Sequence, residues 1–237
     1  MKTVIHRAET RGAANFGWLD ARHTFSFGRY YNPDRMSFGV LRVLNDDRIA
    51  GGAGFPTHPH DNMEIVTIPL EGALEHNDSM GNTAVIEKGK VQVMSAGTGV
   101  QHSEYNKNEN EELKLLQIWM IPNKQNVTPR YDEVAISEIA VENELYQILS
   151  PNPDDDGVWV HQNSWWYMIQ TTKDSHLTYK FKDETNGLYI FLIKGSITID
   201  GEQLSTRDGI GIYQTSSFDF NITQDSEALF MEVPLKF

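Results

Sequence analysis

The stretch EIVTIPLEGALEHND, residues 64–78, contains an apolar run, a glycine at position 72, a second run and a polar turn. Apolar runs rich in β-branched residues and bounded by Gly, Asn and Asp favour strands over helix turns. The same order returns in LYIFLIKGSITIDG, residues 188–201, around Gly195. We therefore expect a pair of strands meeting at a glycine in each half of the chain.

A second pair of glycines supports an internal duplication. Gly89 precedes VQVMSAG in the first half, and Gly209 opens GIGIYQTS in the second. Gly72 and Gly195 are 123 residues apart, and Gly89 and Gly209 are 120 residues apart. Two landmarks with nearly the same offset indicate that one structural unit occurs twice.

Short apolar or alternating runs continue along the chain, which predicts a mostly β fold. One segment with modest helical character, EVAISEIAVENELYQI, covers residues 133–148. The polar stretch PNKQNVTPRYDE, residues 122–133, holds two prolines and marks a boundary. We expect one domain over residues 1–132 and a second over residues 133–237, with a loop at 150–157 inside the second.

Composition excludes several classes of function. The 237 residues include 33 acidic and 20 basic ones, a net charge of −13, without a basic run. Nucleic acids and anionic membranes are bound through clustered Lys and Arg, so we expect neither as a direct partner. The absence of cysteine excludes disulfides, thiolate nucleophiles and Cys-based metal sites. The N-terminus has no apolar signal region, and no apolar run is long enough to span a membrane, so a cytoplasmic protein is expected.

Two histidine pairs could carry chemistry. His58 and His60 flank Pro59, and residues i and i+2 of a strand point to the same face. His102 and Glu104 form a second pair with that spacing. Three neutral imidazoles and a carboxylate would suit Fe(II), Mn, Ni, Cu or Zn.

Each pair could instead consist of surface or hydrogen-bonded loop residues, because such spacings also arise by chance. His76 and Asp78 share the spacing within a segment that is typical of a turn, and we interpret them as an accidental pair.

The spacing around these pairs resembles the two motifs of the cupin superfamily. The first segment has Gly52, five residues, His58-Pro-His60, three residues, Glu64, seven residues and Gly72. The second has Gly89, five residues, Ser95-Ala-Gly97, four residues, His102, three residues and Asn106. Cupins usually carry proline at the position of Ser95 and two fewer residues before the last histidine. The resemblance implies double-stranded β-helix (jelly-roll-like) barrels with a metal inside.

A narrower family accommodates these departures. Four segments resemble the pirins, and the resemblance covers nearly the whole chain: GWLDARHTFSFGRYYNPD, THPHDNMEIVTIPLEGALEHNDSMGN, VMSAGTGVQHSEYN and LQIWMIP. Pirins are bicupins, and several bacterial members have quercetin 2,3-dioxygenase activity. The resemblance implies that His58, His60, His102 and Glu104 are the metal ligands. Glu64 then becomes a supporting residue instead of a ligand.

The second half lacks this set of ligands. Only His161 and His176 remain there, and neither forms a pair with another histidine or with a glutamate at i+2. Pirins likewise keep an empty C-terminal cupin, which would have a structural or partner-binding role.

Three functions follow from the resemblance. The first is a metal-dependent dioxygenase that cleaves quercetin or a related enol-bearing aromatic with O2. Fe(II) is the first expectation for its metal, and Glu104 would accept the substrate's hydroxyl proton. The alternative is a non-enzymatic iron or redox sensor that regulates by binding a protein partner. A cupin isomerase acting on a sugar phosphate is disfavoured because no basic cluster that could bind phosphate is evident.

Further residues are candidates for the walls of the site. Gln117 and Trp119 alternate on one strand and could line the barrel or pack in its core. The phenylalanines of HTFSFG, residues 23–28, could border an aromatic pocket or belong to the core.

Overall fold

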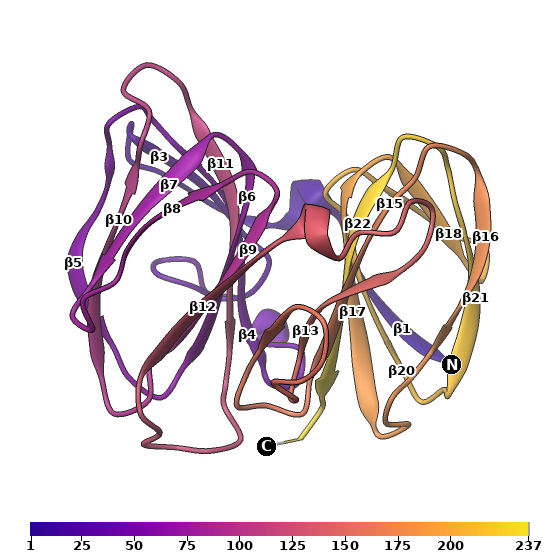
Figure 1. Ribbon diagram of the computed structural model, residues 1–237. Helices are drawn as coiled ribbons and strands as arrows, with labels where there is room; N and C mark the ends of the chain where they lie inside the picture. Colours follow the sequence, from indigo (N-terminus) through magenta and orange to yellow (C-terminus); the bar gives the residue numbers. More distant parts are fainter. Residues whose placement is uncertain (237) are drawn as a thin grey trace.

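The computed structural model describes residues 1–236, which consist almost entirely of strands and loops. The strands form four sheets, two of seven strands and two of four. Figure 1 shows them as two barrels side by side, the first in indigo to magenta and the second in orange to yellow. The prediction of a mostly β chain with two tandem barrels is confirmed.

The first barrel combines a seven-stranded and a four-stranded sheet. The large sheet contains, from edge to edge, β12 (Arg130–Ala135), β9 (Lys90–Ser95), β6 (Glu64–Glu71), β11 (Leu113–Met120), β4 (Leu41–Ile49), β3 (Leu19–His23) and β2 (Gly12–Asn15). The small sheet contains β5 (Gly54–His60), β10 (Val100–Asn106), β7 (Ala73–Asp78) and β8 (Thr83–Glu87).

The second barrel repeats this arrangement. Its large sheet contains β1 (Lys2–His6), β20 (Gly209–Tyr213), β17 (Asn186–Lys194), β22 (Glu227–Pro234), β15 (Trp165–Gln170), β13 (Tyr146–Ser150) and β14 (Val158–Trp159). Its small sheet contains β16 (Ser175–Lys180), β21 (Ser217–Ile222), β18 (Ser196–Ile199) and β19 (Glu202–Ser205). Three short 3-10 helices complete the described elements: η1 (Ala8–Thr10), η2 (Pro33–Arg35) and η3 (Ile136–Glu138).

The two matched glycines occupy equivalent corners. Gly72 joins β6 to β7 with φ of 81°, and Gly195 joins β17 to β18 with φ of 96°. Residues with a Cβ rarely adopt such angles, so glycine is favoured where a strand leaves the large sheet for the small one. The duplication read from the glycine offsets therefore corresponds to a repeated strand–corner–strand unit.

Two strands do not follow the predicted division at residue 132, which itself stays a prediction. Strand β1 at the N-terminus pairs with β20 of the second barrel, from Lys2 opposite Tyr213 to His6 opposite Gly209. Strand β12 runs across positions 132 and 133 and pairs with β9 of the first barrel. The chain thus begins in the second barrel before it builds the first.

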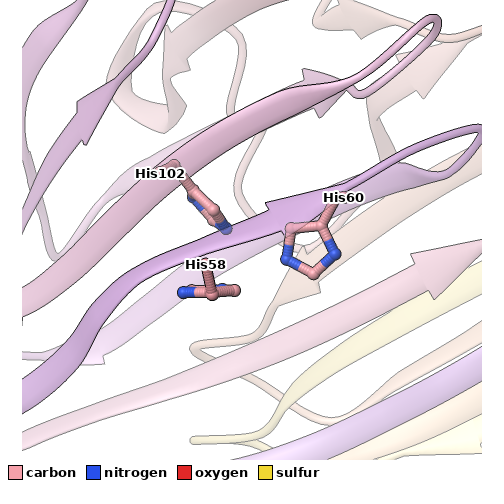
Figure 2. Close-up of side chains that lie close together, drawn as sticks. All are labelled: His58, His60 and His102. Carbon is pink, nitrogen blue, oxygen red and sulfur yellow. The ribbon is translucent and has the colours of Figure 1, made fainter.

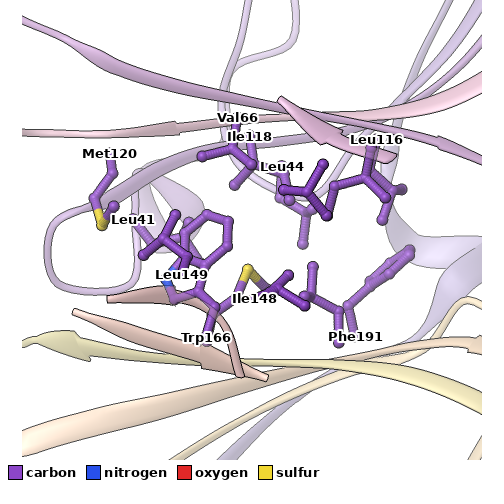
Figure 3. Close-up of a cluster of buried hydrophobic side chains, with 14 of the residues drawn as sticks. Leu41, Leu44, Val66, Leu116, Ile118, Met120, Ile148, Leu149, Trp166 and Phe191 are labelled. Atoms are coloured by element: carbon purple, nitrogen blue, oxygen red, sulfur yellow. The ribbon is translucent and has the colours of Figure 1, made fainter. Parts of the chain in front are cut away.

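The largest core lies between the barrels. Alternate residues of the large sheets point outward from each barrel into this core, where side chains of both halves meet (Figure 3). Val66 and Ile118 come from the first barrel, and Trp166 and Phe191 from the second; all four are at most 1% exposed. Because both faces of these strands are buried, β6 and β17 have continuous apolar runs instead of a polar–apolar alternation.

The segment with modest helical character, residues 133–148, does not form an α-helix. Its first residues finish β12, Ile136–Glu138 form the 3-10 helix η3, and Tyr146 begins β13. Tertiary pairing with β9 and β15 overrides the modest helical pattern of this segment. The loop predicted at residues 150–157 connects β13 to β14. Within residues 1–236, no helix has the length and apolar character needed to cross a membrane.

Candidate metal centre

Three histidines meet on the inner face of the small sheet of the first barrel. Strand β5 is extended from Gly54 to His60, so His58 and His60 point to one side. Strand β10 pairs with β5 and places His102 directly opposite His58. The ring centroids of His58 and His102 lie 4.4 Å apart, and that of His60 lies 4.9 Å from each of the other two. Figure 2 shows the three rings around one shared space.

Glu104 lies two residues beyond His102 on β10, and the pairing with β5 has a bulge between them. It is 3% exposed and lines the same cavity as His58 and His60. The ligand atoms of the three histidines lie within 4.8 Å of one another, and Glu104 joins His102 and His76 in a second such group. All four residues predicted as ligands therefore border one place in the barrel, and their role as ligands stays a prediction.

The histidine nitrogens are available for a metal. Burial, together with the neighbouring His58, lowers the pKa of His60 to about 4 and that of His102 to about 3, so both rings are neutral at pH 7. The Nε2 atoms of His60 and His102 are buried and have no hydrogen-bond partner among residues 1–236. His58 Nδ1 lies 2.8 Å from the carbonyl oxygen of Pro56 and donates to it, so Nε2 is the ring nitrogen left to face a metal.

Unpaired buried nitrogens are costly unless something binds them. Three imidazoles beside one carboxylate match the donor set of divalent transition metals. The residues present therefore fit such an ion.

A chain of hydrogen bonds orients Glu104. Gln117 Nε2 donates to both carboxylate oxygens, at 3.3 and 3.1 Å, and Trp119 Nε1 donates to Gln117 Oε1 at 3.0 Å. Burial raises the pKa of Glu104 to about 7, and the bond from Gln117 opposes that rise. The sequence left open whether Gln117 and Trp119 line the barrel, and the structure places both on the cavity wall.

The cavity over this site has a volume of about 170 Å³. Its walls are aromatic and polar: Phe27, Asn45, Asp47, Phe55, His58, His60, Glu104, Gln117 and Trp119. The two phenylalanines of HTFSFG separate here, because Phe27 borders the cavity whereas Phe25 is fully buried in the core between the barrels. Larger hollows occur elsewhere, such as one of about 360 Å³ beside Ile136 and Met168, but no histidine lines that one.

Sequence reasoning missed Asp47 and Asn45, which line the cavity from β4. Asp47 is 4% exposed, and its Oδ1 has no hydrogen-bond partner in the described part of the chain. Burial, with further contributions from Asp46, Glu104 and Asp20, raises its pKa to about 8. The available signal was two polar residues at i and i+2 in a strand whose neighbours on that face, Val43 and Ile49, are apolar.

Glu64 and Ser95 account for one departure from the cupin motif. Ser95, which stands where cupins usually have proline, donates its hydroxyl to Glu64 Oε2 at 2.7 Å. Glu64 is 1% exposed and does not appear on the wall of the cavity. The backbone of His161, in the second half of the chain, also helps to lower the pKa of Glu64. This position agrees with a supporting role.

Glu64→Gln should change how stability depends on pH. Burial raises the pKa of Glu64 from 4.5 to about 7, with the bonds from Ser95 and His161 opposing that rise. The folded chain therefore holds a proton that the unfolded chain releases between these values, and stability falls as pH rises from about 4.5 to 7. Between pH 5 and pH 8 the free energy of unfolding of Glu64→Gln should gain about 2 to 3 kcal/mol relative to the parent. Urea unfolding of metal-free protein at both pH values measures this, and an equal difference at both would contradict it.

His76 and Asp78 were interpreted as an accidental pair in a turn, and the assignment to a turn is wrong. Both residues belong to strand β7, and the exposed fraction of each side chain is 0%. The polar residues that suggested a turn finish a strand whose inner face adjoins His102.

Comparison with known proteins agrees with this architecture. Residues 5–120 match the family Pirin, and residues 147–233 match the quercetinase C-terminal cupin domain. The chain is 44% identical over 230 residues to quercetin 2,3-dioxygenase of Escherichia coli strain K12, covering 97% of this chain and 98% of that protein. It is 35% identical over 222 residues to a pirin-like protein of Caulobacter vibrioides, covering 93% and 95%.

A solved structure extends the comparison. The bacterial pirin YhhW of Escherichia coli, in complex with nickel(II), has a TM-score of 0.93 against this chain. The two are 42% identical, and the match covers 98% of this chain and 99% of that one.

Proposed function

The chain belongs to the pirin family of bicupins, and from this premise we propose that it is a metal-dependent dioxygenase that cleaves quercetin or a related flavonol with O2. The observation that carries the proposal is the convergence of three histidines and a buried glutamate beside one small aromatic-walled cavity. The quercetin 2,3-dioxygenase of Escherichia coli, with 44% identity over nearly the full length, supports the choice of substrate class.

His58, His60, His102 and Glu104 would hold one divalent metal. When bound, the metal supplies the Lewis-acid and redox chemistry that the reaction of a flavonol with O2 requires. The donor set accepts Fe(II), Mn, Ni, Cu or Zn, and we propose Fe(II) first. The nickel(II) complex of YhhW supports a divalent ion of this group.

Glu104 is proposed to take the proton of the substrate's reacting hydroxyl. Ionised substrate is more readily oxidised, and a base works best when its pKa lies near the working pH. Burial raises the pKa of Glu104 to about 7 in the metal-free site, and a bound cation would favour the carboxylate ion, the form that accepts the proton. Gln117 and Trp119 hold the carboxylate in a fixed orientation through two successive hydrogen bonds. The carboxylate is therefore already oriented to accept the proton when the substrate's hydroxyl group binds.

The size of the cavity limits how the substrate enters. Pockets that enclose drug-sized ligands have volumes of about 300 Å³ or more. At about 170 Å³, this cavity admits the hydroxyl-bearing ring portion, and the rest of a flavonol would extend outward. Phe27, Phe55 and Trp119 offer aromatic surfaces against which the entering portion can pack.

Oxygen uptake by metal-loaded protein with quercetin tests the proposal. We expect substrate-dependent consumption of O2, and we expect His58→Ala to abolish it, because that ring stands directly opposite His102 in the site. His176→Gln is the matched control, since His176 is an exposed residue of the second barrel bonded to Asn221. Uptake that His58→Ala leaves unchanged would refute the proposal. Metal-loaded protein that consumes no O2 with any flavonol would favour the non-enzymatic regulator instead.

A further inference from the structure

His76 and Asp78 lie immediately behind His102 in the small sheet. Strand β7 pairs with β10 so that Asp78 stands opposite His102 and His76 stands opposite Glu104. The side chains of His76 and Asp78 point to the same face, and both are completely buried. His76 Nδ1 lies 3.5 Å from His102 Nδ1, and its other nitrogen, Nε2, lies 3.1 Å from Asp78 Oδ2.

The surroundings of Asp78 determine which nitrogen of His76 carries a proton. Its Oδ1 accepts from the backbone amides of Met80 and Asn82, at 2.9 and 3.0 Å, and its Oδ2 accepts from Asn82 Nδ2 at 2.8 Å. Three unambiguous donors converge on it, which favours the carboxylate ion, and a carboxylate can only accept. The contact with His76 is therefore an N–H donated from Nε2 to Asp78.

The same direction of hydrogen-bond donation extends from His76 back to His102. Full burial disfavours an imidazolium, so a His76 ring with its proton on Nε2 presents a lone pair at Nδ1. Two lone pairs facing each other at 3.5 Å would repel, so His102 must supply the proton of this contact from its own Nδ1. Its Nε2 then has the lone pair, and that atom is the one without a partner among residues 1–236.

We propose that Asp78 and His76 are a positioning pair that holds His102 in the Nδ1–H tautomer and aims its Nε2 lone pair at the metal. The inference rests on the metal site of the proposed function, but not on its substrate. Neither residue touches substrate or metal in this role; both act through His102.

The second barrel supports this assignment by contrast. The offset of 123 residues between Gly72 and Gly195 brings Ile199 to the position of His76. Ile199 stands opposite Phe220 on β21 as His76 stands opposite Glu104 on β10. Where no ligand has to be oriented, the same place holds buried apolar side chains. A buried polar pair that costs desolvation is consistent with a role in the site beyond stability of the barrel.

The tautomer of His102 can be read from metal-free protein. Long-range ¹H–¹⁵N correlation spectra of ¹⁵N-histidine-labelled chain should show His102 with a protonated Nδ1 and an unprotonated Nε2, and His76 with a protonated Nε2. This measurement needs neither substitution nor activity. His102 protonated on Nε2 in the parent chain would overturn the proposal.

Two substitutions test the direction of the hydrogen bonds. In Asp78→Asn the amides of Met80 and Asn82 retain the oxygen at the Oδ1 position, so the new amide nitrogen faces His76 and the side chain of Asn82. Asn82 then turns its amide oxygen toward this nitrogen, and the direction of donation through His76 reverses. His102 should then protonate on Nε2, and affinity for nickel(II) should fall about 10- to 100-fold. His76→Gln offers a donor to Asp78 and an acceptor to His102, so it should keep the tautomer and hold nickel affinity within about threefold of the parent.

Asp219→Asn is the charge-matched control, because Asp219 is an exposed residue of the second barrel that accepts from Thr178. It should leave tautomer and nickel affinity unchanged, and all soluble variants should bind one nickel(II) per chain. Asp78→Asn with parental tautomer and parental affinity would overturn the proposal. Two nickel ions per parent chain would overturn it as well, since His76, His102 and Glu104 would then form a second ion site.

Discussion

Glu104→Gln is expected to lower kcat for quercetin-dependent oxygen uptake by about 10²- to 10⁴-fold, the usual range for loss of a general base. Glutamine keeps the size of the side chain and an oxygen that can accept from Gln117 Nε2, but an amide cannot take up the substrate's proton. Nickel affinity should fall by a smaller factor, because His58, His60 and His102 remain. The rate must therefore be expressed per bound metal ion.

The pH profile shows which ionisation state of Glu104 the reaction needs. Activity that needs the ionised carboxylate rises with pH through the pKa of Glu104 and is lost below it. That pKa is raised to about 7 by burial, and a bound cation favours the carboxylate ion, so the acid limb should lie below pH 7. Glu104→Gln should lose this limb.

Glu64→Gln is the control for this experiment. Glu64 is another buried glutamate of the same barrel and lies away from the cavity wall. The variant should keep both the parental kcat and the acid limb of the pH profile. A Glu104→Gln rate per bound metal within threefold of the parent would contradict the assignment of Glu104 as the base.

Local sequence patterns predicted the repeated unit of the fold. The corners at Gly72 and Gly195 need a positive φ, and their flanking runs have the composition of strands, so both signals lie within a few residues. The resemblance of the motifs to pirins, and hence the bicupin fold, is confirmed. The extended geometry at His58-Pro-His60 was also predictable, because proline restricts the preceding residue.

Pairings between distant strands were not predictable in this way. Nothing in residues 2–6 indicates that β1 would join β20, more than 200 positions later. The segment at 133–148 has a helical pattern of its own, yet edge pairing with β9 extends its first residues. In both places the structure depends on the strand with which the segment pairs, and the segment's own sequence does not identify that strand.

The alternation of side chains along a strand predicted which residues share a face, but not whether that face lines the site or packs in the core. Gln117 and Trp119 share a face of β11, and Ile118 lies on the other, but both faces of this strand are buried. One faces the metal centre and the other the second barrel, so burial patterns alone could not decide between site and core. His76 and Asp78 were missed for a related reason: their contact with His102 depends on the register of β7 against β10.

A fragment ending at residue 132 is expected not to fold, although the sequence marks a boundary there. The outer faces of β4, β6 and β11 are apolar and pack against the second barrel (Figure 3). Without residues 133–237 that face would meet water, at about 25 cal/mol for each Å² of apolar surface left exposed. The cut also removes the last three residues of β12 and leaves β1 without β20.

The fragment should show poorly dispersed amide signals and no tight binding of nickel(II), even though it contains all four predicted ligands.

Trp166→Ala in the full chain tests the contribution of the shared core to stability, because Trp166 is 0% exposed and packs in that core. It should lower the free energy of unfolding by about 3–5 kcal/mol. Phe16→Ala, which alters an aromatic residue that is 57% exposed, should change it by less than about 0.5 kcal/mol. A dispersed spectrum and parental nickel affinity for the fragment would instead establish residues 1–132 as an independent domain, with the shared core contributing little to its stability.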